Sequence, residues 1–195
     1  MNVRLLASIP LLAIAALSFG ESLHIRAKAM IAQRLIERAW QQTLSGTAQS
    51  RPWHWADTWP VARLSSGRLR RDLFVLSGFG GGSLAFGPGH YANTPLPGLD
   101  GTSVIAGHRD THFSFLRDVE AGEALRVQDA RGQWSTYRVR DRLIVDTREA
   151  GVWSTAPSRD ELHLITCYPF DTIAPGGPLR LIVVAEKVAE ESQGV

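Results

Sequence analysis

From Pro60 onward the chain is built of short apolar runs separated by turn-forming residues. These runs are too short and too regularly punctuated for long helices, and several alternate between apolar and polar positions. Strands with this length and spacing are typical of an all-β barrel or sandwich. The pattern predicts about eight strands, over residues 61–64, 69–77, 83–86, 103–106, 124–127, 134–145, 162–166 and 179–188.

The N-terminal part of the chain has a different pattern. Residues 5–19 form an uncharged apolar run that would span about 22 Å as a helix, which is shorter than the ~30 Å hydrocarbon core of a bilayer. The run fits either a cleaved signal peptide or an uncleaved signal anchor. A helical stripe then follows, and it favours the uncleaved anchor because it continues the helix. Its apolar members are Leu23, Ala27, Met30, Ile31, Leu35 and Ala39.

These patterns divide the chain into four parts. We assign residues 1–20 to the anchor or signal peptide, 21–42 to an amphipathic helix, 43–54 to a small polar linker and 55–190 to one globular domain. A chain of 195 residues is long enough for one domain with an appendage. We expect Trp53, Trp55 and Trp59 to form a core edge or a cap over the sheet.

The net charge of +2 argues against a nucleic-acid partner, since the basic residues are scattered apart from a run at 68–71.

The candidate chemistry starts with Cys167, the only cysteine in the chain. It ends the predicted strand 162–166, and Arg180 begins the returning strand thirteen positions later. His108 follows the predicted strand 103–106 in the same way, after Gly107. A thiol needs a neighbouring histidine or cation to act as a nucleophile, so these three side chains form a minimal set for covalent acyl transfer.

These residues resemble those of the sortases, the cysteine transpeptidases of the bacterial envelope. The resemblance rests on Gly-His-Arg-Asp-Thr-His-Phe around His108, on Leu-Ile-Thr-Cys at 164–167 and on the arginine thirteen residues later, and it extends over residues 55–187. The histidine at 163 departs from the family's usual Thr-Leu-x-Thr-Cys pattern. The layout and the Gly-Pro-Gly-His stretch at 87–90 look most like the Gram-negative sortases or their class D and E relatives.

The resemblance implies a closed eight-stranded β-barrel with few short helices, and it implies that residues 55–190 are the sortase catalytic domain. It makes His108, Cys167 and Arg180 the catalytic residues and Thr166 the threonine before the nucleophile. We expect Thr166, His90 and His163 to bind substrate or flank its groove. We expect no cofactor and no metal, since His108 and His112 have a metal-like spacing without a third ligand.

By the same resemblance, the partners are a protein with a Leu-Pro-x-Thr-Gly-like sorting signal, cleaved between Thr and Gly, and an amine acceptor. The N-terminal segment would be a single-pass anchor in the inner membrane with the domain on the extracytoplasmic side.

Two other functions remain open at this stage. The first is another envelope cysteine acyltransferase resembling the L,D-transpeptidases, although their Ser-x-Gly-Cys motif is absent. The second is a non-catalytic, peptide-binding β-barrel in which Cys167 is a buried, inert thiol.

Overall fold

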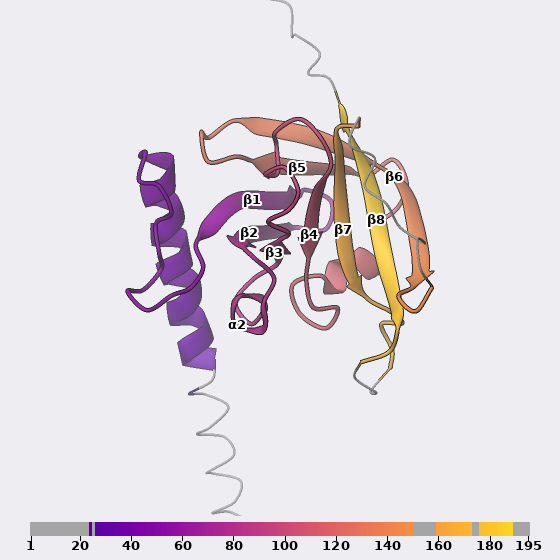
Figure 1. The fold of residues 1–195 in the computed structure, drawn as a ribbon, viewed down its shortest axis with the longest axis horizontal. Coiled ribbons are helices and arrows are strands. Elements are labelled where there is room, and N and C mark those ends of the chain that lie inside the picture. Colours follow the sequence, from indigo (N-terminus) through magenta and orange to yellow (C-terminus); the bar gives the residue numbers. More distant parts are fainter. Residues whose placement is uncertain (1–23, 25, 150–158, 173–175, 189–195) are drawn as a thin grey trace, which may run out of the picture.

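The computed structural model describes residues 24, 26–149, 159–172 and 176–188 as a β-barrel with a helix packed against its side (Figure 1). The elements are β1 (Pro60–Ser66), β2 (Arg71–Ser77), α2 (Gly81–Leu84), β3 (Gly89–His90), β4 (Ser103–Ala106), the 3-10 helix η1 (Ser114–Arg117), β5 (Ala124–Gln128), β6 (Trp134–Asp146), β7 (Glu161–Cys167) and β8 (Leu179–Val188).

The eight strands close into a barrel in the order β1-β2-β3-β4-β7-β8-β6-β5. Two pairings are parallel, β2 with β3 and β4 with β7, and the others are antiparallel. The prediction of a closed, eight-stranded all-β barrel is therefore confirmed. The long connection from β4 through β5 and β6 to β7 brings residues from distant parts of the chain to neighbouring positions.

One predicted strand is wrong. Residues 83–86 form no strand; α2 covers Gly81–Leu84, and the short β3 follows at Gly89–His90. The Ser83 hydroxyl donates to the Gly80 carbonyl at 2.9 Å, and the Leu84 N–H donates to the same carbonyl at 3.1 Å. These local bonds favour a helical turn over an extended run.

The barrel interior is filled by alternating residues of the longer strands. On β8, Leu181, Val183 and Ala185 belong to the hydrophobic core, and on β7 Leu162 and Leu164 do. This alternation agrees with the strands predicted at 162–166 and 179–188. The intervening residues of β7 and β8 consequently point out of the barrel.

The N-terminal helix is present over residues 26–44, but its buried face differs from the predicted stripe. Ala32, Ile36, Ala39 and Trp40 are buried, whereas Met30 and Ile31 are 63% and 60% exposed. Trp40 is fully buried and its ring packs 6.4 Å from that of Phe74 on β2. The partner surface on the barrel therefore selects the buried face.

The segment between the helix and β1 is packed against its neighbours. The Ser50 hydroxyl, predicted to lie in a polar linker, is buried and bonds Gln42 of the helix. Trp59 packs against the core and Trp53 stacks edge-on to Phe86 at 5.0 Å, but Trp55 is 73% exposed. The expectation of a packed tryptophan cluster is thus wrong for Trp55.

The predicted anchor at residues 1–20 lies outside the described residues. Among the helices that the structure describes, none is long and apolar enough to cross a membrane.

The helix-barrel contact yields a stability prediction. Trp40→Ala should lower the free energy of unfolding by about 3–5 kcal/mol because it removes a fully buried aromatic side chain. Trp40→Phe should cost less than about 1.5 kcal/mol, since Nε1 of Trp40 has no hydrogen-bond partner among the described residues and phenylalanine removes that buried N–H. Urea denaturation followed by circular dichroism measures both; equal losses would contradict this account.

Candidate functional site

Cys167 and Arg180 face each other across the β7–β8 pair. Cys167 ends β7, Arg180 is the second residue of β8, and the two are direct partners in the antiparallel register. The Tyr168 N–H donates to the Leu179 carbonyl at 3.0 Å. The adjacent Cys167–Arg180 pair therefore occupies a non-hydrogen-bonded position, where facing Cα atoms are about 4.5 Å apart and side chains are closest.

His108 reaches the same end of the sheet from the other side of β7. Ala106 of β4 is in register with Ile165, and the Gly107 N–H donates to the Ile165 carbonyl at 3.0 Å. Extending this parallel register by two residues places His108 level with Cys167. His108 is exposed, and Cys167 and Arg180 are each partly exposed, so solvent reaches all three side chains.

Gly107 has a steric role in this arrangement. A Cβ atom at this position would lie 2.8 Å from the ring of Phe113, which is fully buried. The Phe113 N–H also donates to the His108 carbonyl at 3.0 Å. A glycine before the histidine lets this phenylalanine close the turn that presents His108.

The outer face of β4, β7 and β8 forms two rows behind the cysteine. Ala106, Ile165 and Ile182 pair across the three strands in the first row, and Val104, His163 and Val184 pair in the second. These residues alternate with core residues and so share a face with Cys167. Val104, His163, Ile182 and Val184 are buried, and Ala106 and Ile165, next to the thiol, are the partly exposed members of the two rows.

His163 lies on this face but away from Cys167. It is four residues back along β7, about 13 Å at 3.3 Å per residue. Its side chain is buried, and Nε2 lies 2.7 Å from an oxygen of Glu161, whose other oxygen accepts from Arg140 at 3.0 Å. Burial lowers the pKa of His163 despite the opposing effect of Glu161. Its observed role is in a buried polar network.

His90 is not brought to the site. It pairs with Ile105, whose side chain is in the core, so it lies on the opposite face of the sheet from Cys167. It is buried, and its Nε2 contacts the Pro95 carbonyl at 2.9 Å and the Thr94 hydroxyl at 3.2 Å. Burial lowers the pKa of His90. The placement explains His90 as a structural residue of the loop after β3.

Thr166 is buried on the inner side of β7. Its hydroxyl donates to the Gly107 carbonyl at 2.7 Å. Since Gly107 precedes His108 and Thr166 precedes Cys167, this single bond connects the two segments directly beside the candidate catalytic side chains. The hydroxyl of Thr166 is thus engaged within the protein, and its contact with substrate stays a prediction.

Arg109 is a residue that the sequence analysis did not single out. Its side chain is 8% exposed, and it donates from Nη1 to the Pro169 carbonyl at 2.8 Å and from Nη2 to the Thr172 carbonyl at 3.0 Å. The residue after His108 thus holds the loop that follows Cys167. Its position in the Gly-His-Arg-Asp motif was the signal in the sequence that could have drawn attention to Arg109. Its contacts with the Pro169 and Thr172 carbonyls are visible only in the fold.

A second arginine contacts the same loop from η1. Arg117 forms an ion pair with Asp171 at 2.8 Å and lies over the ring of Phe170 at 5.3 Å. Both side chains of this pair are largely exposed. It is therefore a weaker contact than the buried clasp of Arg109.

His112 and Asp110 complete the turn after His108. Burial, together with the charge of His108, lowers the pKa of His112. Asp110 is exposed and pairs with Arg109 at 3.4 Å. In the part of the chain that the structure describes, no three His, Cys, Asp or Glu side chains are grouped to hold a metal ion.

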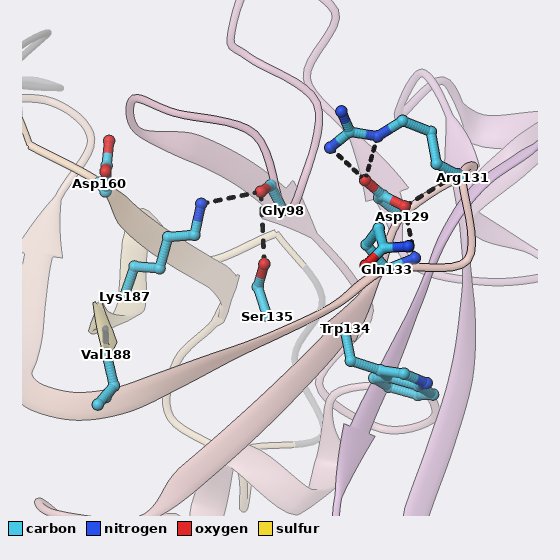
Figure 2. A pocket seen from close by; sticks show the side chains of 9 residues that line it. All are labelled: Gly98, Asp129, Arg131, Gln133, Trp134, Ser135, Asp160, Lys187 and Val188. Carbon is cyan, nitrogen blue, oxygen red and sulfur yellow. Dashed lines mark hydrogen bonds and ion pairs between the residues drawn. The ribbon is translucent and has the colours of Figure 1, made fainter. Parts of the chain in front are cut away.

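A polar pocket of about 520 Å³ lies at the other end of the barrel (Figure 2). Its lining includes Trp134 at the start of β6 and Lys187 near the end of β8, whereas Arg180 is at the start of β8. Its charged groups are already engaged: Asp129 pairs with Arg131 at 2.7 Å, and Lys187 donates to the Gly98 carbonyl at 3.1 Å. This pocket is separate from the Cys167 site.

Comparisons with known proteins agree with this geometry. A family model described as "Sortase domain" matches residues 66–188. Sortase D of Bacillus subtilis (strain 168) is 31% identical over 121 residues, which cover 62% of this chain and 60% of that protein.

Solved sortase structures share the fold. Sortase A of Corynebacterium diphtheriae, in a lid mutant, superposes with a TM-score of 0.62 at 22% identity, covering 84% of this chain and 96% of that one. A Clostridium perfringens Sortase D5 transpeptidase superposes with a TM-score of 0.59 at 19% identity, covering 78% and 89%. The family model alone covers more than half of the chain, and the chain therefore belongs to the sortase family, a family of cysteine transpeptidases.

Proposed function

We propose that this protein is a cysteine transpeptidase that cleaves a C-terminal sorting signal and transfers the cleaved protein to an amine acceptor at the cell envelope. The observation that carries the proposal is the convergence of three strand ends. Cys167 at the end of β7 is paired with Arg180 of β8, and β4 on the other side of β7 brings His108 level with Cys167. A nucleophile, a cation and an acid-base group thereby meet at one solvent-accessible edge.

In the first half-reaction, the Cys167 thiolate attacks the carbonyl carbon of the scissile peptide bond. The tetrahedral intermediate collapses as the C–N bond breaks, and a thioester to Sγ forms. His108 gives a proton to the departing amine. In the second half-reaction His108 takes a proton from the incoming amine, which attacks the thioester and releases the thiolate.

Arg180 stabilises the negative oxygen of the tetrahedral intermediate or fixes the substrate backbone. A guanidinium suits either role because it stays charged and presents several directed donors. Its Nη1 donates to the carbonyls of Gly177 at 2.6 Å and Leu179 at 2.9 Å. These bonds hold the guanidinium near the start of β8.

The substrate we propose is an extended peptide resembling Leu-Pro-x-Thr-Gly, cleaved between Thr and Gly. Ala106 and Ile165 are partly exposed apolar residues beside Cys167 on the outer face, which supports binding of a short apolar segment that leads to the scissile bond. His90 is left out of this proposal because it lies on the opposite face, and His163 is left out because it is buried and contacts Glu161.

The location we propose is the extracytoplasmic side of the inner membrane, with residues 1–20 as a single-pass anchor. The uncharged run at residues 5–19 supports it, followed directly by a helix that packs on the catalytic barrel. Because the chain belongs to the sortase family, we do not propose the alternative function of an L,D-transpeptidase. A non-catalytic peptide-binding barrel is the alternative that the following experiment tests.

The full chain incubated with Leu-Pro-x-Thr-Gly peptides should form a covalent adduct on Cys167 that hydroxylamine releases. Intact mass spectrometry detects the adduct. Cys167→Ala should form none because it lacks the sulfur that accepts the acyl group. Turnover that persists in Cys167→Ala would contradict the assignment of Cys167 as the nucleophile. The absence of any adduct across varied peptides would favour the non-catalytic peptide-binding barrel.

Arg180→Lys should lower kcat by about 10²- to 10³-fold, since lysine retains the charge but loses the planar set of donors. Steady-state cleavage of a fluorogenic sorting peptide measures the change. Lys187→Arg, a change at the far end of β8, serves as the matched control and should leave kcat unaltered. A wild-type rate in Arg180→Lys would reduce Arg180 to a structural residue.

Arg109 acts as a positioning residue in this mechanism, because it clasps the loop after Cys167 to the turn that carries His108. Arg109→Lys cannot span both carbonyls, so kcat should fall by about 10- to 100-fold as the two segments lose alignment. The pH profile of Cys167 alkylation should change as well. Arg117→Lys breaks only an exposed contact and should leave both readouts near wild type.

A purely structural role for Arg109 has a different signature. Arg109→Lys would then lower the melting temperature without altering kcat or the pH profile of the folded enzyme, and that result would overturn the positioning role.

A further inference from the structure

An apolar groove of about 630 Å³ lies between the N-terminal helix and the segment before β1. Its apolar lining comes from Ile31, Ala32, Leu35, Trp53, Trp55 and Phe86, and its polar lining includes Lys28 and Asp57. None of these residues belongs to the strand ends that carry Cys167, His108 or Arg180. The groove is thus a second surface feature with no part in the proposed chemistry.

The rim of this groove exposes large apolar side chains. Ile31 is 60% exposed and Trp55 is 73% exposed, and both line the groove. Met30, which precedes Ile31 on the helix, is 63% exposed. Met30 lies about 100° around the helix from Ile31 and does not line the groove, so the exposed apolar rim consists of Ile31 and Trp55. Large apolar side chains exposed side by side at a groove often mark a contact surface.

The groove is held open by contacts to the barrel. The Gln33 amide donates to the Phe86 carbonyl at 2.6 Å, and the Trp53 and Phe86 rings stack at 5.0 Å. Further along the helix, Ile36 and Trp40 are buried. The helix is therefore fixed beside the barrel, and the exposed rim cannot be buried by a simple rotation of the helix.

The sequence next to the groove indicates what covers it. The apolar run at residues 5–19 precedes the helix, and the exposed cations Arg26 and Lys28 lie between that run and the apolar rim. Among the described residues, Asp57 is the one acidic side chain that lines the groove. Basic residues beside tryptophan and aliphatic side chains, next to an apolar segment, are typical of the interface between membrane and water.

We propose that this surface, made of Ile31, Trp55 and Lys28 at the groove, with Arg26 at the N-terminal end of the helix, lies in the headgroup region of a bilayer containing anionic phospholipid, and that the groove receives lipid acyl chains. The inference rests on the proposed membrane anchor at residues 1–20. Under this proposal the barrel contacts the membrane in one orientation, whereas an anchor alone would leave the barrel free to rotate.

This orientation has a consequence for the active site. The N-terminal end of the helix and the end of the barrel where β7 turns into β8 point to the same side of the molecule (Figure 1). A membrane contact at the groove therefore keeps the Cys167 end of the barrel on the side toward the bilayer. A substrate that is itself tethered to the membrane would present its sorting signal there.

The test uses the full chain in vesicles of phosphatidylcholine and phosphatidylglycerol. In a Cys167→Ala background, single cysteines are introduced as Ile31→Cys, Trp55→Cys and Leu96→Cys and labelled with an environment-sensitive fluorophore. Leu96 is the matched control because it is 41% exposed and apolar but lines a pocket with Thr43 and Gly46, beyond the opposite end of the helix.

We expect headgroup-level spin-labelled lipids to quench the label at positions 31 and 55 several-fold more than at 96. The difference should shrink in vesicles of phosphatidylcholine alone, because Arg26 and Lys28 then lose their anionic partners. If the chain co-floats with the vesicles but all three positions are quenched equally, the proposed membrane contact at the groove is overturned while the anchor is retained. A chain that does not float with the vesicles would overturn both.

Cleavage assays on the native chain and on its Trp55→Ser variant separate the proposed chemistry from the proposed membrane contact. This variant should cleave a soluble sorting peptide at the wild-type rate, since Trp55 lies outside the site. Failure of the native chain to cleave would contradict the proposed function without bearing on the quenching result.

Discussion

The site depends on the position of β7 between a parallel and an antiparallel neighbour. A parallel strand brings its C-terminal end beside the C-terminal end of its partner, so β4 delivers His108 where β7 delivers Cys167. The antiparallel β8 starts at that same end and brings Arg180 opposite the cysteine. Three segments that are separated by up to 72 positions in the sequence are thereby held together by backbone hydrogen bonds.

Contacts outside the strands refine this alignment. The Thr166 hydroxyl donates to the Gly107 carbonyl and so connects β7 to the residue before His108. The guanidinium of Arg109, the residue after His108, donates to the Pro169 and Thr172 carbonyls in the loop beyond Cys167. Both are buried, so they act where water competes least for hydrogen bonds. The result is an edge at which the side chains of His108, Cys167 and Arg180 are at least partly exposed, while Thr166 and Arg109 are buried. Exposed contacts such as Arg117–Asp171 add little by comparison.

The two faces of the β4–β7–β8 sheet have different surroundings. Inward residues of β7 and β8 fill the barrel core, and outward residues form the rows that end at the thiol. The outward residues Ile182, Val184 and His163 are themselves buried, so this face is packed as firmly as the core side. The N-terminal helix packs on another side of the barrel, where Ile36 and Trp40 are buried.

The sequence by itself determined the strand pattern, the closed barrel through its resemblance, and the three residues at the strand ends, because alternation and turn residues are local signals. It missed the helical turn at 81–84, since serine hydroxyl bonds compete with an extended run. It also misjudged the helix face: Met30 and Ile31 are exposed while Ile36 and Trp40 are buried.

Only the tertiary structure decided the placement of His90, Thr166 and Arg109. Their identity as polar residues near a motif is visible in the sequence, but their contacts depend on which face of a strand they occupy and which distant carbonyl they meet. That choice is made by strand register and long-range packing, which no local pattern specifies.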